Sequence, residues 1–420
     1  MRRMEDNSVD AVVTDPPYGW NFMNKTFDKD VPSEDIRKEV LRVLKPGAHL
    51  LAACGTRTYH RTVTRIEDAG FNIRDCIVWA YGCLSEDTEI LTSVGWKNYK
   101  DLLLSDNILQ WNKEDNSLSW SNPKHIFVYD IDDSMVLLEN RTTSQLLTQN
   151  HTVYAKIRKN FRNSKPTAFS SVKAGSIKKK WQLDLPVAGL LETGIDVKYS
   201  YLIGWWLADA QKRCNGKTVM FSHRKKEMII KLRDALDAVG ARYSVYINIA
   251  KKKGHRDKYT FHVAGDVANY FLENQSKRDL DFDILLWNKN SRYQLLEGLF
   301  DGGHSKSYGH SEVLRSKNLF KLDVVQALCV SLNIRSYIDY KKSCLYLSRK
   351  HNTSQIQHKH KRPNQQYVGK VWCIETEVGA FVVRRNGKPF ITGNSGFPKS
   401  LDISKALDRE LGCEREIVGQ

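Results

Sequence analysis

The chain lacks any apolar run as long as the roughly 18 residues that a membrane helix needs. Its first residues also lack the charged and apolar regions of a secretion signal. We therefore expect no membrane partner.

Cysteine and acidic residues are the other shortages. The eight cysteines are scattered, and no two have the Cys-x-x-Cys spacing of metal sites, so they read as reduced thiols. Acids number 48 against 65 lysines and arginines, which gives a net charge of +17 and favours an acidic partner such as nucleic acid. The 420 residues are enough for two to four domains.

The chain contains two segments that read as one continuous sequence interrupted by a long insertion. Residues 77–82, Ile-Val-Trp-Ala-Tyr-Gly, continue sensibly into residues 395–400, Ser-Gly-Phe-Pro-Lys-Ser, if everything from Cys83 to Asn394 is removed. The chain thus looks like one protein inserted in another.

In the outer protein, the apolar strand predicted at 9–14 runs into Asp15-Pro16-Pro17-Tyr18. Two prolines end a strand, and ligand sites of open α/β sheets lie at such strand ends. The tetrapeptide resembles the catalytic motif of DNA methyltransferases that modify an exocyclic amine (N6 of adenine or N4 of cytosine). The resemblance implies that Asp15 and the carbonyl of Pro16 accept hydrogen bonds from that amine, that Tyr18 stacks on a flipped base, and that the intact enzyme uses S-adenosylmethionine.

The flanks 1–82 and 395–420 are expected to form part of a Rossmann-like α/β domain. Helices are predicted at 33–44, 58–69 and 401–411, and strands at 49–55 and 73–80, an alternation typical of a doubly wound sheet. Neither flank contains the Gly-rich motif that holds S-adenosylmethionine. We therefore expect a fragment of the enzyme, with an active site-specific methyltransferase as the alternative.

Four blocks in the inner protein resemble those of inteins, the elements that excise themselves by protein splicing. They are residues 83–102, residues 146–153 with the Thr-x-x-His pattern, residues 371–383 and residues 387–394. The resemblance implies an all-β, horseshoe-shaped splicing (HINT) domain made from 83–180 and 365–394, and a cytoplasmic location in a prokaryotic or phage-infected cell.

Intein chemistry assigns a role to each junction residue. The Cys83 thiol attacks the carbonyl of Gly82 and replaces the amide with a thioester, while His151 transfers the proton and Thr148 holds the distorted peptide. Ser395 then accepts the acyl group, Asn394 cyclises and cuts the chain, and the flanks rejoin. The reaction is intramolecular and needs no cofactor.

The inner protein departs from the intein pattern at two positions. The residue before the terminal asparagine is usually histidine and here is Gly393. This predicts slower or differently assisted cleavage at Asn394. Cys373 occupies a position that is often aspartate; it tunes the Ser395 step or belongs to the sheet core.

Residues 152–197 read as loop-rich and basic, either a solvated linker or a phosphate-contacting segment. A duplication follows, in which 201–210 matches 295–304. Each copy precedes a predicted helix and strand, at 225–239 and 242–247 in the first copy and at 318–332 and 335–340 in the second.

The repeats resemble the LAGLIDADG homing endonucleases, which implies a duplicated α+β domain over 198–348 that binds double-stranded DNA. Such enzymes hold metal, here Mg²⁺, at an acid below each helix. The acid of the first repeat is Asp209. The equivalent position of the second repeat is Gly303, which has no carboxylate and is flanked by Asp301 and His304. We expect a degenerate endonuclease; an active one in which Asp301 or His304 compensates is the alternative.

Overall fold

The computed structural model of the chain describes residues 3–19, 29–55, 57–74, 82–158, 168–212, 216–250, 255–274, 280–303, 306–308 and 311–393. It divides into two units, Met1–Trp79 and Ala80–Gln420. Within the described residues, no helix is both long and apolar enough to cross a membrane.

The first unit contains a parallel β-α-β element. Strand β1 (Val9–Thr14) pairs in parallel with β2 (Leu44–Ala52), and helix α1 (Glu34–Val43) connects them. A second helix, α2 (Tyr59–Asp68), follows. The strand predicted at 9–14 and both helices are confirmed, whereas β2 starts earlier than expected. The strand predicted at 73–80 lies largely, and the helix at 401–411 wholly, outside the described residues.

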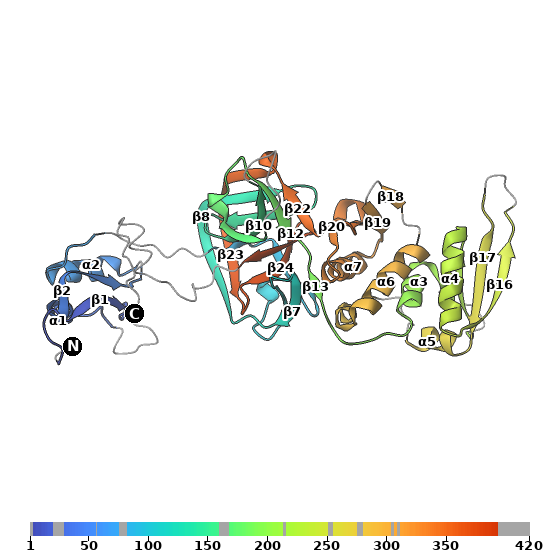
Figure 1. Cartoon of the computed structure of the whole chain (residues 1–420), viewed down its shortest axis with the longest axis horizontal. Coiled ribbons are helices and arrows are strands. Elements are labelled where there is room, and N and C mark those ends of the chain that lie inside the picture. The colour runs from blue at the N-terminus through green and yellow to red at the C-terminus, as the bar shows by residue number, and fades with distance from the viewer. Residues whose placement is uncertain are drawn as a thin grey trace. The chain divides into compact units, whose positions relative to one another are not determined.

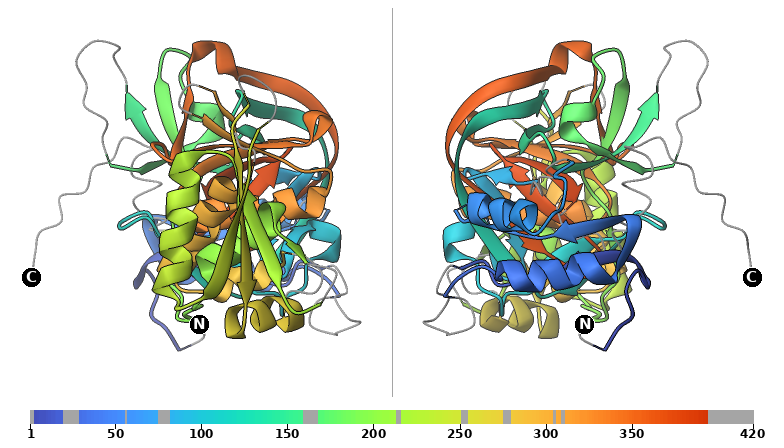
Figure 2. Two further views of the ribbon diagram at one scale, coloured as in Figure 1. Left: turned by 90° about the vertical axis from the view of Figure 1, so that its right-hand side faces the viewer. Right: turned by 90° about the vertical axis from the view of Figure 1, so that its left-hand side faces the viewer.

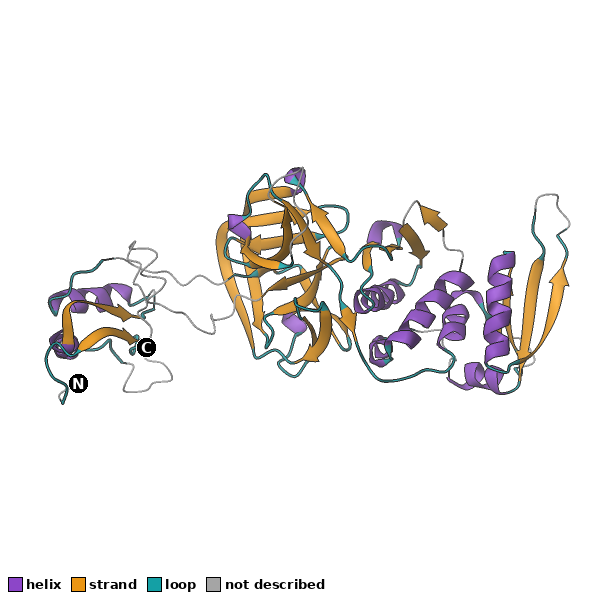
Figure 3. Ribbon diagram, viewed as in Figure 1, coloured by secondary structure: helices purple, strands orange, loops and turns teal. Residues whose placement is uncertain are grey.

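In the second unit, the first and last described strands form an all-β body; strands are drawn in orange in Figure 3. Its strands are β3 (Leu84–Ser85), β4 (Thr88–Thr92), β5 (Gly95–Asn98), β6 (Ile108–Trp111), β7 (Ser117–Ser121), β8 (His125–Glu139), β9 (Ser144–Thr148), β10 (Thr152–Arg158), β11 (Ser170–Lys173), β12 (Gln182–Pro186), β13 (Leu190–Leu191), β22 (Thr353–Ile356), β23 (Lys361–Glu375), β24 (Ala380–Arg385) and β25 (Lys388–Gly393).

Three sheets make up this body. Strands β23, β3, β9 and β8 close into a barrel, and β11, β10, β12 and β22 form a four-stranded sheet. The third sheet runs β13-β7-β6-β24-β4-β5, with β25 added beside β24. Residues far apart in sequence are therefore neighbours, because β8 and β23 pair along nearly their whole length.

The segment 152–197 was predicted as loop-rich, and that prediction is wrong. Strands β10, β11 and β12 lie in it, and β12 pairs with β10 and β22. Its basic residues masked the alternation: Val153 and Ala155 of β10 are buried, and their neighbours are more exposed. The sheets of the body accordingly reach beyond 180 and begin before 365.

Strand β24 lies between two apolar cores. Phe381 and Val383 pack with the body residues Trp372 and Phe390. Val382, on the opposite face, packs in a second core that continues into the inserted segment. This division follows from the strand's two-residue period, which sends alternate side chains to opposite faces.

The insert repeats one motif twice (Figure 1). The first copy consists of α3 (Ser200–Asp209), β14 (Gln211–Lys212), β15 (Val219–His223), α4 (Lys226–Ala238), β16 (Arg242–Asn248), β17 (Lys258–Ala264) and α5 (Asp266–Asn274). The second consists of α6 (Lys289–Gly302), β18 (Lys306–Tyr308), β19 (Ser311–Arg315), α7 (Leu319–Ser331), β20 (Arg335–Asp339) and β21 (Cys344–Ser348).

Each copy forms a four-stranded antiparallel sheet, with order β14-β15-β17-β16 in the first and β18-β19-β21-β20 in the second. Figure 2 shows α4 running alongside the strands of the first sheet. The helices and strands predicted from the repeat are confirmed, and so is their order.

Helices α3 and α6 pack through glycines. A Cβ on Gly204 would overlap the Leu295 carbonyl oxygen, and one on Gly298 would overlap that of Tyr201. Only glycine permits this backbone approach. The packing explains why both copies carry glycine at the same place.

Candidate active site

Cys83 lies immediately before β3, at the entrance to the barrel. Leu84 pairs with Trp372 of β23 and with Leu147 of β9, which fixes the chain on both sides. The Cys83 side chain is 2% exposed and packs with Met135, Val371, Cys373 and other apolar residues. The thiol is therefore buried among apolar side chains and is nearly inaccessible to solvent.

Thr148, the last residue of β9, grips the peptide bond that joins Gly82 to Cys83. The Cys83 N–H donates to the Thr148 hydroxyl at 2.7 Å, and the Thr148 N–H donates to the Cys83 carbonyl at 3.1 Å. The two residues are 65 positions apart. The sequence-predicted role of Thr148 as a holder of the scissile amide fits this geometry.

Gly82 presses against the backbone of the residues that follow Thr148. A Cβ at this position would overlap the Cα of His151 and would lie 2.7 Å from the Asn150 carbonyl oxygen. A larger residue would push the scissile carbonyl away from the imidazole. The upstream junction is thus built for glycine.

His151 is fully buried beside this peptide. Burial lowers the pKa of its imidazole to about 4, while the adjacent Gly82 backbone acts in the opposite direction. The ring is therefore neutral near pH 7. Its Nδ1 is buried without a hydrogen bond of ordinary geometry, and its Nε2 lies 2.6 Å from Oγ1 of Thr392.

Thr392 is the site residue that the sequence did not reveal. It lies on β25, 241 positions from His151, and its side chain is fully buried. A threonine within a strand is ordinary, since β-branched residues favour sheets. The one available signal was its position two residues before Asn394.

Cys373 lies on β23 within the same cluster as Cys83, with 1% exposure. Burial raises the pKa of the Cys83 thiol, and the nearby Cys373 adds to the effect. The Cys83 thiol is thus protonated at neutral pH. The cluster fits each of the two roles expected of Cys373, as a core residue and as a neighbour of the nucleophile.

Gly393 ends β25 in a crowded place. A Cβ there would come within 2.8 Å of the Cβ and Cγ2 atoms of Thr152. A histidine at 393 would require Thr152 to move, which gives a packing reason for the departure noted in the sequence. Asn394 and Ser395 lie outside the described residues.

The tetrapeptide Asp15-Pro16-Pro17-Tyr18 follows β1 directly, as predicted. Asp15 is exposed, and the Tyr18 hydroxyl donates to its Oδ1 at 2.5 Å. The acid and the aromatic residue of the motif are therefore adjacent in space.

The predicted metal site is not assembled in the described part of the chain. Asp209 is the last residue of α3, and its side chain is not described. Asp301 accepts a hydrogen bond from the Tyr201 hydroxyl at 3.0 Å and pairs with Lys231 at 2.9 Å. Gly303 caps α6 without a side chain, and His304 lies outside the described residues. Among the described residues, no group of three or more His, Cys, Asp or Glu could hold a metal ion.

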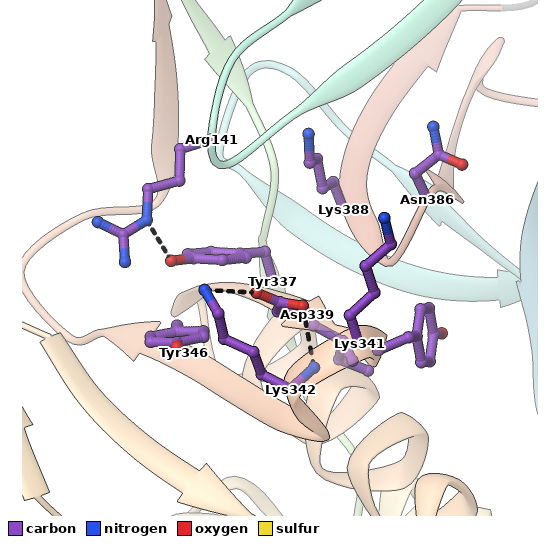
Figure 4. Close-up of a pocket in the computed structure, with 10 residues that line it drawn as sticks. Arg141, Tyr337, Asp339, Lys341, Lys342, Tyr346, Asn386 and Lys388 are labelled. Atoms are coloured by element: carbon purple, nitrogen blue, oxygen red, sulfur yellow. Dashed lines mark hydrogen bonds and ion pairs between the residues drawn. The ribbon is translucent and has the colours of Figure 1, made fainter.

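A basic hollow of about 580 Å³ lies where the body meets β20 and β21 of the insert (Figure 4). Tyr337 and Tyr346 stack there with ring centroids 4.8 Å apart, and the Arg141 guanidinium lies 5.5 and 5.4 Å from the two centroids. Three lysines and one acid also line it: Lys341, Lys342, Lys388 and Asp339. Lys342 pairs with Asp339 and Lys388 pairs with Glu139, so the positive charge of the hollow rests on Arg141 and Lys341, which form no ion pair among the described residues.

No protein-family model matches the chain. Among curated proteins, the ATP-dependent Clp protease proteolytic subunit of Chlamydomonas moewusii is 27% identical over 95 residues. That match covers 23% of this chain and 9% of the relative, so the chain spans only a small part of its length.

Solved structures similar to the chain include a class 3 split intein, AceL NrdHF, with 9% identity, 75% of this chain and 99% of that chain covered, and a TM-score of 0.29. They also include the homing endonuclease I-DmoI in complex with DNA and Mn, with 18% identity, 37% and 89% covered, and a TM-score of 0.26. A third is WhiA from Thermatoga maritima, with 15% identity, 36% and 50% covered, and a TM-score of 0.26.

Proposed function

We propose that residues 83–394 are an intein that excises itself from a host protein resembling a DNA amino-methyltransferase. The observation that carries this proposal is the meeting of both ends of the segment at His151. The backbone of His151 packs against the upstream junction residue Gly82, and the Gly82 backbone acts on the buried imidazole. The Nε2 of the same ring lies at hydrogen-bond distance from Thr392, two positions before Asn394. An ordinary β-domain has no need to bring its first residue and its last strand to one buried histidine.

The first step exchanges an amide for a thioester. Sγ of Cys83 attacks the Gly82 carbonyl carbon, the new C–S bond forms, and the bond to the Cys83 nitrogen breaks. The thiol proton moves to neutral His151 and from there to the departing amine. The raised pKa of the thiol and the lowered pKa of the ring, about 4, both oppose a stable imidazolium, so the ring holds this proton only transiently and passes it to the more basic departing amine. Thr148 holds the scissile N–H throughout.

The remaining steps return the flanks to a normal peptide. The Ser395 hydroxyl attacks the thioester, forms an ester and restores the Cys83 thiol. The Asn394 side-chain nitrogen then attacks its own carbonyl carbon, closing a succinimide and breaking the bond to Ser395. The freed Ser395 amine finally attacks the ester carbonyl and forms the Gly82–Ser395 amide. Every bond broken is matched by one formed, and no cofactor takes part.

Trapping the thioester tests this proposal. Excess dithiothreitol should cleave the purified Asn394→Ala chain, which cannot complete splicing, between Gly82 and Cys83, because an added thiol attacks a thioester but leaves an amide intact. Mass spectrometry of the released 1–82 fragment should show the dithiothreitol adduct or its hydrolysis product. A chain that stays uncut at this bond under prolonged treatment would contradict the proposal.

The insert is proposed to bind double-stranded DNA, and the basic hollow favours this second function. Arg141 and Lys388 come from the body, and Lys341 and Lys342 from the insert, so both parts face one patch of positive charge. Within the described residues, Lys341 forms no ion pair, which leaves its ammonium group available to a phosphate. We expect no DNA cleavage, because Asp301 is already bound by Lys231 and Tyr201 and so does not replace the missing acid.

Replacing Lys341 or Arg141 with alanine should weaken DNA binding about equally for all sequences. Removing one charge that neutralises a phosphate should reduce the slope of log K against log salt by about 0.9. Fluorescence anisotropy with a labelled duplex at several salt concentrations measures both quantities. Lys124→Ala, which removes an exposed lysine that does not line the hollow, is the matched control. Identical slopes in wild type and in both hollow variants would exclude the hollow from the DNA site.

Mg²⁺ would serve the endonuclease only if the undescribed Asp209 side chain and a second acid met. S-adenosylmethionine would serve the intact host, with Asp15 and Tyr18 at the target amine.

A further inference from the structure

The residue before Asn394 is Gly393, so the downstream junction lacks the histidine that usually assists asparagine cyclisation. The residues packed around β25 indicate which side chain acts instead. Gly393 is crowded by Thr152, so position 393 offers no side chain. The nearest side chain on the same strand is Thr392, and its hydroxyl contacts the Nε2 of His151.

We propose that Thr392 is a positioning residue that couples the upstream and downstream cleavages through its hydrogen bond to His151. The inference rests on the proposed splicing function. Phe390 and Thr392 share one face of β25; Phe390 packs in the body core, and this anchors the strand with Thr392 aimed at the imidazole.

The Thr392 hydroxyl has two neighbours and one proton. Its Oγ1 lies 2.6 Å from His151 Nε2 and 3.4 Å from the Thr152 carbonyl oxygen. When the imidazole is neutral with its proton on Nδ1, Nε2 accepts that hydroxyl proton. In the imidazolium both ring nitrogens carry hydrogen, so Nε2–H donates to Oγ1 and the hydroxyl turns to Thr152.

The direction of this hydrogen bond therefore depends on the protonation of His151 in the upstream step, and the bond attaches the ring to β25, the strand that ends at the downstream junction. The hydrogen bond persists in both states of the imidazole, so the strand stays attached to the ring during the whole sequence. Without the hydroxyl, β25 would keep its apolar anchor but lose its polar attachment to the catalytic histidine. Position-dependent steps lose about a hundredfold in rate when a reacting group shifts by about 1 Å.

A purely structural role predicts something different. If Thr392 only satisfies a buried nitrogen, its removal destabilises the fold and slows both junctions alike. The two cleavages must therefore be measured separately.

The test uses the full chain with Thr392→Val, Thr392→Ala and Thr392→Ser. Upstream activation is followed by dithiothreitol-dependent release of 1–82, and downstream cleavage by release of 395–420, each from pH 5 to pH 9. Thr392→Val and Thr392→Ala should slow downstream cleavage by about tenfold to a hundredfold and upstream activation far less, and Thr392→Ser should restore the downstream rate.

The control is Thr92→Val, since Thr92 is also fully buried in the body and its hydroxyl donates to the Gly95 carbonyl at 2.7 Å. It should leave the ratio of the two rates unchanged. Equal losses at both junctions, an unaltered downstream rate, or failure of Thr392→Ser to restore it would each overturn the coupling role. A wild-type chain that never forms a thioester would instead remove the proposed splicing function itself, so the two failures are distinguishable.

Discussion

Cys83→Ala is expected to abolish splicing and leave the full-length chain intact at the upstream junction. Alanine has no nucleophile, and no other thiol replaces it: Cys373, its buried neighbour, lies on another strand and is not attached to the amine that must depart. The body should still fold, because the change removes one sulfur atom from an apolar cluster. Gel electrophoresis and intact mass after expression give the result directly.

Cys329→Ala is the matched control for this variant. Cys329 is also fully buried, but it lies on α7 in the insert. It should splice as the wild type does. A joined 1–82/395–420 product from Cys83→Ala would show that the upstream bond is activated by some other group.

His151→Ala should slow thioester formation by about 10²–10⁴-fold, the usual contribution of a positioned acid–base group. The expected decrease follows from the burial of the ring, on which the Gly82 backbone acts, and from its hydrogen bond with Thr392. Among the described residues, we find no second imidazole beside Gly82 or Gly393 that could replace His151. The rate is read from the time course of dithiothreitol-dependent release of 1–82.

His223→Ala controls for the removal of a buried histidine. His223 is nearly as buried, but its Nδ1 accepts from the Lys225 N–H in the insert. This variant should keep the wild-type rate. An unchanged rate in His151→Ala would remove the imidazole from the mechanism.

The sequence could predict those site residues that lie in recognisable sequence blocks. Cys83 and the Thr148–His151 pair fall inside recognisable blocks, and the structure brings all three together. The repeated glycines could also be recognised in the sequence. The structure gives the reason for them: α3 and α6 approach too closely for any residue with a Cβ. The outline of β1, α1 and α2 followed from periodicity alone.

What the sequence could not show depends on long-range packing. Thr392 is chemically ordinary, and it reaches His151 because β25 packs beside β9 and β10, the strands on either side of the histidine. The Lys231–Asp301 pair joins residues on two helices, so the engagement of Asp301 could not be read from the motif. The strands in 152–197 were hidden by charge, since Lys156 and Arg158 make β10 read as a basic segment although Val153 and Ala155 are buried on its other face.

The most direct test of the central claim is the intact mass of the wild-type chain after expression. We predict two products, one of residues 83–394 and one in which residues 1–82 are joined to 395–420, with a Gly82–Ser395 peptide bond visible by fragmentation. Persistence of the single full-length chain, in wild type and Cys83→Ala alike, would contradict the proposed splicing.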